Sequence, residues 1–411
     1  TCVFKLPRYG LLQSAAIKCV INLQGTVAEQ ANSTTGRFLD RGIAHHLGYY
    51  LCDSISLTSH SKEIEKLIPL TQLSDYMRLD TEAKSAFNVL TQAPPFLCGD
   101  EFEHHAGSLT DGTLHDKNKL VVYIPLHFSF SKGLHLNLDL SFLEELEIQC
   151  NIAARDDVFY KRPHPNTETS AAQNVYGAST IVSFELITYF QQLSNANAKK
   201  LQSSQFNLSS GQPLTCLYQN AYEENPKTVT HTRSGDADNG FYQETVVDLS
   251  CKHLVWETII AVEQKPQPGD AVATATPQNG QQQTFLDKKA FTYRPIKEVE
   301  LFMSGRSIWK TTGHEARMLE PVLLGQRRGR PISQISLFGA DNKSHREKQL
   351  EFMSIPWSQD SANALNQMTG ALSLKGASAP QLRIRWAINS ELPETDFIVR
   401  VCHKYYSAVS F

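Results

Sequence analysis

The two halves of this chain carry the same series of segments in the same order. Each series has an apolar strand ending in a polar turn, a strand-like run with a proline, an alternating strand and a last apolar strand. In the first half these are residues 54–57 with the turn 58–60, then 123–128, 146–152 and 181–186. In the second half they are residues 299–303 with the turn 304–306, then 353–358, 382–388 and 397–401. Such a repeat predicts two β domains of one design in tandem.

Strand periodicity dominates both series. Within residues 146–152, apolar Leu146 and Ile148 alternate with polar Glu147 and Gln149, which places one face of the strand on a core. The same alternation recurs in residues 382–388 and 18–23. Residues 253–262 (HLVWETIIAV) lack it, so we expect a strand buried on both faces or a strand that crosses a bend.

Helical signals are few and local. Asp80 can cap a helix that continues through Leu90, because apolar side chains of this segment fall on one helix face. Pro69 interrupts any helix that enters from Lys62. The sequence therefore predicts an all-β protein with a few short helices in long loops.

The length of 411 residues fits two domains of about 200 residues each. A polar segment at 195–205, a short helix or linker, lies between the two series. We therefore expect a first domain at 1–192, a linker at 193–212 and a second domain at 213–411. Short strands and long loops, such as 93–119 and 265–283, favour sandwiches of the jelly-roll or immunoglobulin-like kind.

Charge and cysteine usage exclude several classes of protein. The net charge of -3 gives no reason to expect nucleic-acid binding. No signal peptide or membrane span is evident, so we expect folding in the cytosol. The eight cysteines are scattered without a Cys-x-x-Cys pair, which predicts buried reduced thiols. In a cytosolic protein the three sequons, at Asn32, Asn207 and Asn342, would be chance matches.

The residues that could act in catalysis or metal binding form no strong motif. The adjacent histidines are His45-His46 and His104-His105, and the adjacent glutamates are Glu144-Glu145 and Glu223-Glu224. Neighbours on a strand point to opposite faces, so such a pair cannot bind one metal or act as an acid and base couple there, whereas a histidine pair in a loop could bind a metal. Residues 236–240 (DADNG) resemble a calcium loop but have Val247 at the twelfth position. The sequence predicts no catalytic residues, no cofactor-binding residues, no metal ligands and no enzymatic activity.

Two further features have mainly structural interpretations. The basic run 327–330 (RRGR) reads as a solvated loop, with a docking patch for an acidic partner, nucleic acid or nuclear import as the alternative. Proline within a strand-like run belongs at a strand start, an edge or a bulge, as expected for Pro125 and Pro356. The four tryptophans are expected as core or interface anchors: Trp256, Trp309, Trp357 and Trp386.

The segments resemble the double jelly-roll major capsid proteins of nucleocytoplasmic large DNA viruses. Residues 123–132 (YIPLHFSFSK) match that family's Pro-Leu-x-Phe-x-Phe segment through Pro125, Leu126, Phe128 and Phe130. Residues 249–256 (LSCKHLVW) are similar to its strand ending in a Val/Ile-Trp pair, and residues 299–306 to its strand leading into an Asn-Gly-x-x-Arg turn. The second half departs from the family at 367–373 (QMTGALS), and a virophage or polinton-like origin fits as well.

The resemblance implies two tandem eight-stranded antiparallel jelly-roll sandwiches. It also implies a structural role: a homotrimer forming a pseudo-hexagonal capsomer that tiles the icosahedral shell of a double-stranded DNA virus. The implied partners are neighbouring capsomers and minor capsid or penton proteins, with no specific nucleic acid and with an internal viral membrane near but not spanned. The implied location is the virion capsid, with assembly in the host cytoplasm or nucleus. The alternatives are a carbohydrate-binding β-sandwich protein and a viral assembly scaffold of the same fold.

Overall fold

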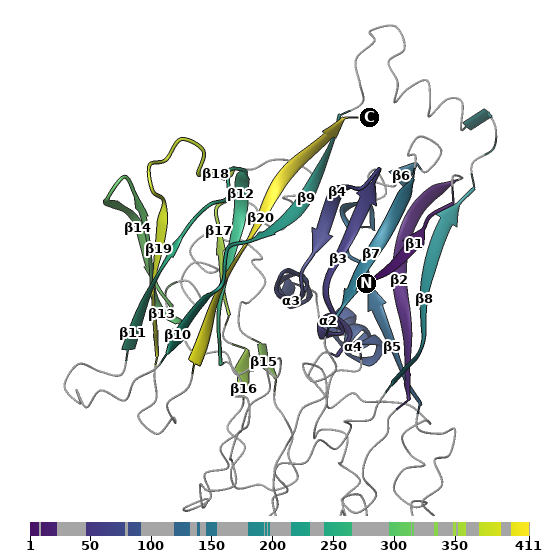
Figure 1. Ribbon diagram of the computed structural model, residues 1–411, viewed down its shortest axis with the longest axis horizontal. Helices are drawn as coiled ribbons and strands as arrows, with labels where there is room; N and C mark the ends of the chain where they lie inside the picture. Colours follow the sequence, from purple (N-terminus) through teal and green to yellow (C-terminus); the bar gives the residue numbers. More distant parts are fainter. Residues whose placement is uncertain are drawn as a thin grey trace, which may run out of the picture.

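The computed structural model of the chain describes residues 1–7, 10–22, 47–78, 81–91, 119–131, 138–139, 145–153, 180–192, 194, 196–197, 215–230, 242–264, 296–313, 315, 333–335, 348–350, 352–358, 370–387 and 396–410. Strands dominate these residues. They build two sandwiches, each of two antiparallel sheets, that stand side by side (Figure 1), together with a small separate hairpin.

The first sandwich uses strands from the first half of the chain. Sheet 1 has the order β1-β7-β3-β4, and in sheet 2 the central β2 has β5 and β6 on one side and β8 on the other. The strands are β1 (Cys2–Lys5), β2 (Leu11–Asn22), β3 (Cys52–Ser59), β4 (Lys62–Leu67), β5 (Lys119–Pro125), β6 (Leu138–Asp139), β7 (Leu146–Ile152) and β8 (Thr180–Gln191).

The second sandwich repeats this plan. Sheet 3 has the order β11-β19-β13-β14, and in sheet 4 the strand β12 lies between β20 on one side and β17 with β18 on the other. Strands β9 and β10 pair with the far edge of β20. The strands are β9 (Thr215–Glu223), β10 (Lys227–Thr230), β11 (Tyr242–Asp248), β12 (Leu254–Gln264), β13 (Ile296–Met303), β14 (Arg306–Thr312), β17 (Met353–Pro356), β18 (Leu372–Ser373), β19 (Gln381–Ala387) and β20 (Asp396–Ser410). The separate hairpin joins β15 (Ser333–Ile335) to β16 (Lys348–Leu350).

The internal repeat is confirmed strand for strand. Strands β1 to β8 correspond in order to β11, β12, β13, β14, β17, β18, β19 and β20, with the same neighbours in each sheet. Even an irregularity repeats, since the pairing of β2 with β8 shifts between Leu12 and Ser14, and that of β12 with β20 shifts between Val255 and Glu257. The predicted domain limits stay a prediction, because most of 193–212 lies outside the described residues.

The polar turns also have one geometry. The β3–β4 turn has positive φ at His60 and Ser61, and the β13–β14 turn has positive φ at Ser304 and Gly305. Two consecutive residues with positive φ are the mark of a type I′ hairpin, whose twist matches that of the paired strands. Gly305 adopts this conformation without steric cost.

Alternating strands bury one face, as predicted. In β7, Leu146, Ile148 and Cys150 are buried in the first core, which lies between sheets 1 and 2. The second core lies between sheets 3 and 4 and includes Trp386, which is fully buried. Strand β12 is buried on both faces and contains a bulge, so both interpretations of its missing alternation are confirmed. Pro125 and Pro356 each end an outer strand of their sheet.

The described part of the first half also has three helices: α3 (Pro69–Arg78), which lies between the sandwiches, and α2 (Leu47–Tyr50) and α4 (Thr81–Leu90), which lie at the lower end of the first sandwich in Figure 1. The predicted helix through Leu90 is α4, and Pro69 opens α3, where its missing N–H costs nothing. The sequence did not predict α3 itself. Six cysteines form no disulfide, and five of these are buried: Cys19, Cys52, Cys150, Cys251 and Cys402. Among the described residues, no helix is long and apolar enough to cross a membrane.

Candidate functional site: the junction of the two sandwiches

The two sandwiches meet at an apolar junction. Strands β12 and β20 of sheet 4 turn Ile259, Ala261 and Cys402 away from their own core and toward helices of the first half. The helices and one later segment supply the other members of the cluster: Tyr49, Tyr50, Leu70, Leu73, Tyr76, Phe87 and Phe352. This second burial explains why β12 is apolar on both faces.

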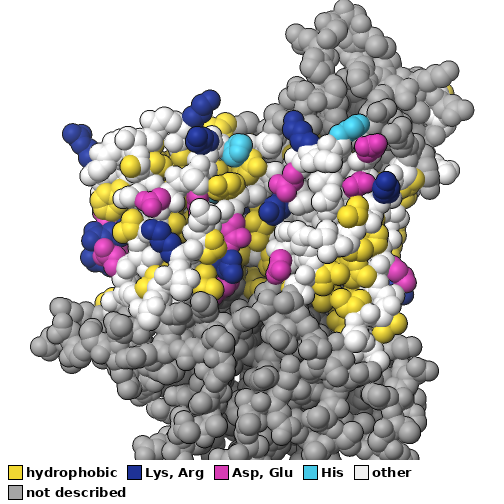
Figure 2. Space-filling model, viewed as in Figure 1, with side chains coloured by type: hydrophobic (Ala, Val, Ile, Leu, Met, Phe, Trp, Pro, Cys, Tyr) yellow, Lys and Arg dark blue, Asp and Glu magenta, His cyan; other side chains and the backbone are white. Residues whose placement is uncertain are grey.

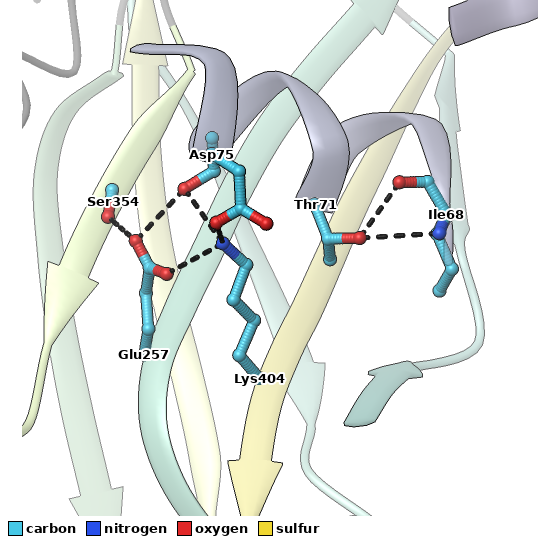
Figure 3. A network of polar contacts seen from close by, with 7 residues as sticks. Ile68, Thr71, Asp75, Glu257, Ser354 and Lys404 are labelled. Carbon is cyan, nitrogen blue, oxygen red and sulfur yellow. Dashed lines mark hydrogen bonds and ion pairs between the residues drawn. The ribbon is translucent and has the colours of Figure 1, made fainter. Parts of the chain in front are cut away.

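A charged network lies beside this cluster. The Lys404 ammonium is 2.6 Å from Asp75 Oδ1 and 3.2 Å from Glu257 Oε2. Glu257 also accepts hydrogen bonds from Ser74, at 3.1 Å, and from Ser354. Figure 3 shows these groups converging from α3, β12, β17 and β20. The network therefore joins the first sandwich to three strands of the second.

The network is almost dry. The side chain of Lys404 is 5% exposed and that of Glu257 is fully buried. Ions removed from water are tolerated only when they are paired and hydrogen-bonded, and removing one partner of such a pair costs about 3–5 kcal/mol. The charges therefore fix how the halves meet, because a displaced junction would leave them unpaired.

A second contact joins strand β9 to the edge of β4. The Asn220 side chain accepts a hydrogen bond from the Lys66 backbone N–H at 2.9 Å and donates one to the Ile64 carbonyl at 3.2 Å. One amide side chain thus replaces the two hydrogen bonds that a neighbouring strand would make. A residue of the second half therefore covers the edge strand of sheet 1, β4, at this point.

A third contact uses a buried carboxylate of the first half. Glu65, 2% exposed, accepts the Ser129 backbone N–H at 2.9 Å and the Ser129 hydroxyl at 3.0 Å. The Ser129 oxygen in turn accepts the Gln219 N–H of β9 at 3.0 Å. Together with the contacts of Asn220, this series of hydrogen bonds docks β9 onto the first sandwich.

The second sandwich contains a buried hydroxyl–imidazole–carboxylate series. Thr258 Oγ1 accepts a hydrogen bond from Trp357 at 2.8 Å and lies 2.9 Å from His403 Nδ1. His403 Nε2 lies 3.3 Å from Glu224 Oε1. These contacts hold the His403 ring between the Thr258 hydroxyl and the Glu224 carboxylate.

Glu224 is held as a carboxylate. Burial acts to raise its pKa, but hydrogen bonds from His403, Ser250 and the backbone N–H of Cys251 outweigh burial and leave the pKa below its ordinary value of 4.5. The order of groups resembles that of a nucleophile, base and acid. However, Thr258 and His403 are each 1% exposed, so no substrate reaches the hydroxyl in this structure. The series is therefore a structural link between β9, β12 and β20.

The glutamates that were considered as a catalytic pair point apart. Glu223 binds Arg400 at 2.6 Å, whereas Glu224 points into the second sandwich toward His403. Most of the other candidate residues from the sequence lie outside the described residues. These are the two histidine pairs, Glu144, residues 236–240, residues 327–330 and the three sequons. No group of three His, Cys, Asp or Glu side chains among the described residues could hold a metal ion. The predicted absence of catalytic, cofactor and metal sites stays a prediction.

The tryptophans are anchors, as predicted. Trp386 is in the second core, and Trp256 lies on the junction side of β12 beside Tyr406 and 5.4 Å from the Lys404 ammonium. Trp309 and Trp357 stack edge to face with ring centres 5.0 Å apart.

The junction residues themselves were missed by the sequence analysis. One signal was present, because Glu257 is the one charged residue within the mainly apolar run 254–262 of β12. Such a residue needs a buried partner. Its partners Asp75 and Lys404 lie far away in the sequence, so periodicity alone could not find them.

The fold resembles that of several viral capsid proteins. PBCV-1 VP54, in a crystal structure fitted into a reconstruction of the virophage Sputnik, matches with a TM-score of 0.61 at 12% identity, covering 100% of this chain and 90% of that one. The Faustovirus major capsid protein matches with a TM-score of 0.56 at 8% identity, over 100% and 87% of the chains. The mavirus major capsid protein matches with a TM-score of 0.53 at 10% identity, over 100% and 86%.

The comparisons by sequence give no match. No family model matches the chain, and no curated protein matches it. At identities this low, what the chain shares with the solved structures is the arrangement of its strands. This chain has the double jelly-roll fold of the major capsid proteins of large DNA viruses and virophages.

Proposed function

We propose that this chain is a major capsid protein that assembles as a trimer into a block with six sandwiches, and that such blocks tile a viral shell. The observation that carries the proposal is a pair of equivalent sheet faces, of which one is covered by the chain itself and the other is covered by no described residue. Full-length likeness to three capsid proteins supports the same role.

The covered face is the outer face of sheet 4. The repeat pairs Ser14 and Tyr189 of sheet 2 with Glu257 and Lys404 of sheet 4, because each pair directly follows the shared irregularity. Glu257 and Lys404 are buried at the junction. Tyr189 is 60% exposed. The outer face of sheet 2 is thus equivalent to the outer face of sheet 4, which the chain buries at the junction. No described residue covers the outer face of sheet 2.

A contact between copies would cover that face. If the second sandwich of one copy docks on sheet 2 of the next, as the first sandwich docks on sheet 4, the contact joins two different surfaces. Head-to-tail contacts of this kind close into a ring when the rotation between copies permits. Three copies of two sandwiches give six sandwiches around one axis, which supports the pseudo-hexagonal block.

Light scattering after gel filtration tests the proposal. The chain should have three times its monomer mass, and Tyr189→Arg should shift it to monomer, because a charge in a buried contact lacks a partner. Tyr242→Arg is the matched control: Tyr242 is 56% exposed on β11 of the opposite outer sheet and should stay trimeric. A folded wild-type chain that is monomeric at high concentration would contradict the proposal.

The proposal extends to the surroundings of the block. Its partners would be neighbouring blocks and minor capsid or penton proteins, and its place would be the virion after assembly in the host cytoplasm or nucleus. Mass spectrometry of purified particles distinguishes a shell protein, present in stoichiometric amount, from an assembly scaffold, which would be absent. A monomeric chain that binds glycans would support a carbohydrate-binding sandwich in place of the capsid role.

A further inference from the structure

The two sandwiches differ at one edge. The edge of β20 that faces away from β12 pairs with β9 from Cys402 to Ser410 and with β10 from Asp396 to Val399. The equivalent edge belongs to β8, which pairs with β2 on one side and with no described strand on the other. Strand β8 is the outermost strand on the right of Figure 1. It is twelve residues long, so a whole row of backbone groups faces outward.

The core beneath this edge is less covered than its counterpart. Phe184, Leu186 and Phe190 of β8 are only partly buried against the first core. Their equivalents in β20 are far more buried: Val399 at 0%, Val401 at 1% and Tyr405 at 8% exposure. The difference follows from the strands on the far side of β20, since Tyr222 of β9 and Val229 of β10 pack against the second core. No described strand packs against the first core in this way on the far side of β8.

Apolar side chains continue onto the surface of β8. Ile181 is 39% exposed and Val182 is 55% exposed. Figure 2 shows hydrophobic side chains gathered on the right of the described surface, the side on which β8 lies in Figure 1. A long, apolar and unpaired edge is a template for another strand.

The charges of the edge indicate what the strand should carry. In the second sandwich Arg400 of β20 is bound on both sides, by Glu263 of β12 at 2.8 Å and by Glu223 of β9 at 2.6 Å. The equivalent residue of β8 is Glu185, the one charged residue of that strand, and its cross-strand partner on β2 is Lys18. The signs are reversed, so the missing neighbour should be basic where Glu223 is acidic.

We propose that the edge of β8 that no described strand pairs with is a strand-addition site, which accepts one extended strand from a separate polypeptide, antiparallel to β8. The incoming strand completes the first sandwich as β9 completes the second. It carries apolar residues at alternate positions to cover the partly buried side chains of β8, and a lysine or arginine that faces Glu185. If the chain builds a shell, as proposed above, the site fastens a second protein to each block.

Peptide binding to the full chain tests the site. The probe is a synthetic peptide of residues 215–224 with Cys216→Ser and Glu223→Lys, and its partner probe keeps Glu223. The lysine peptide should bind about two- to fivefold more tightly, the range expected for one partly exposed ion pair. Hydrogen exchange should slow at the backbone amides of residues 187–191 that point away from β2, the counterparts of residues 402–406 opposite β9, and remain unchanged in β20.

Two controls make the result specific. The variant Glu185→Lys should reverse the preference between the peptides, while the exposed charge swap Glu145→Lys should leave it unchanged. A lysine peptide with alternate backbone nitrogens methylated should not bind, because it cannot donate to the ladder.

Each other outcome overturns the proposal. If the amides of residues 187–191 that point away from β2 were already protected in the free chain, the edge would belong to another segment of the same chain. Protection that rises with protein concentration, without peptide, would assign it to a second copy. A trimer that binds neither peptide would refute the strand-addition site and leave the capsid role intact. A monomer that binds the lysine peptide would refute the capsid role and leave the site intact.

Discussion

Lys404 Nζ lies 2.6 Å from Asp75 Oδ1, and this contact joins β20, the last strand of the chain, to helix α3 of the first half. The two residues are 329 positions apart. Their pairing is possible only after both sandwiches have formed and docked. The junction therefore links the folding of the two halves, and a substitution there should destabilise both.

Removing the Lys404 charge should destabilise the whole chain. Lys404→Met leaves the buried Glu257 and the partly buried Asp75 without this cation, so we expect a loss of about 3–5 kcal/mol in the free energy of unfolding. The double variant with Glu257→Gln should recover part of this loss. Urea unfolding, followed by tryptophan fluorescence, gives the values.

An exposed cation provides the control for Lys404. Arg385 contacts Glu244 at 3.0 Å and Glu298 at 3.4 Å, with 44% of its side chain exposed. Arg385→Met should therefore cost no more than about 1 kcal/mol. Equal effects of the two variants would show that the junction charges are no more important than surface charges.

The side chain of Asn220 should control the edge of β4. Asn220→Ala removes both hydrogen bonds to the β4 backbone and should cost about 1–3 kcal/mol, because the Lys66 N–H and the Ile64 carbonyl lose their partners. Hydrogen exchange at Lys66 should become faster. The exposed Asn151, which bonds Ser54 at 3.0 Å, is the control, and Asn151→Ala should leave the exchange of Lys66 unchanged.

Glu224 should give the stability a defined dependence on pH. Its pKa is lowered in the folded chain, so its contribution is present above the ordinary value of 4.5 and is lost as the pH falls through the lower folded value. Wild type should thus be more stable than Glu224→Gln at neutral pH, and the difference should shrink in acid. Urea unfolding over a pH series measures it. A difference that grows on acidification, or one that Glu185→Gln reproduces, would contradict this assignment.

The β13–β14 turn should depend on Gly305. Its φ of +74° costs other residues roughly 1–2 kcal/mol, and a Cβ there would meet nothing within 4 Å, so Gly305→Ala tests the backbone conformation alone. Ser304→Gly should be tolerated, because φ is +53° at that position too. Thermal unfolding should show a lower midpoint for Gly305→Ala, and an unchanged midpoint would argue against a type I′ turn.

Much of the fold could be predicted because strands leave a local record. The alternation of Leu146, Ile148 and Cys150 indicated a half-buried strand, and the polar residues around Gly305 indicated a turn at the end of a strand. The order of such segments in both halves was enough for two sandwiches of one design. Helix α3 was missed, since it follows a strand directly and its apolar residues serve the junction.

The candidate site could be predicted only in part. Apolarity on both faces of β12 indicated double burial, but it did not indicate what lies on the second face. The ion pairs of Lys404 depend on how two separate sandwiches meet, which leaves no periodic trace in the sequence. The same holds for the open edge of β8, since its composition is that of any buried strand.

The sequence by itself determined that the chain makes strands, that it makes them twice and where each strand turns its apolar face. These properties depend on neighbours a few residues apart. Only the tertiary structure decided that the first half docks on the outer face of sheet 4, whereas no described residue covers the equivalent face of sheet 2. The physical reason is that docking requires a shared buried surface and paired charges, such as Lys404 with Asp75 and Glu257, from strands and helices that meet only in the folded chain.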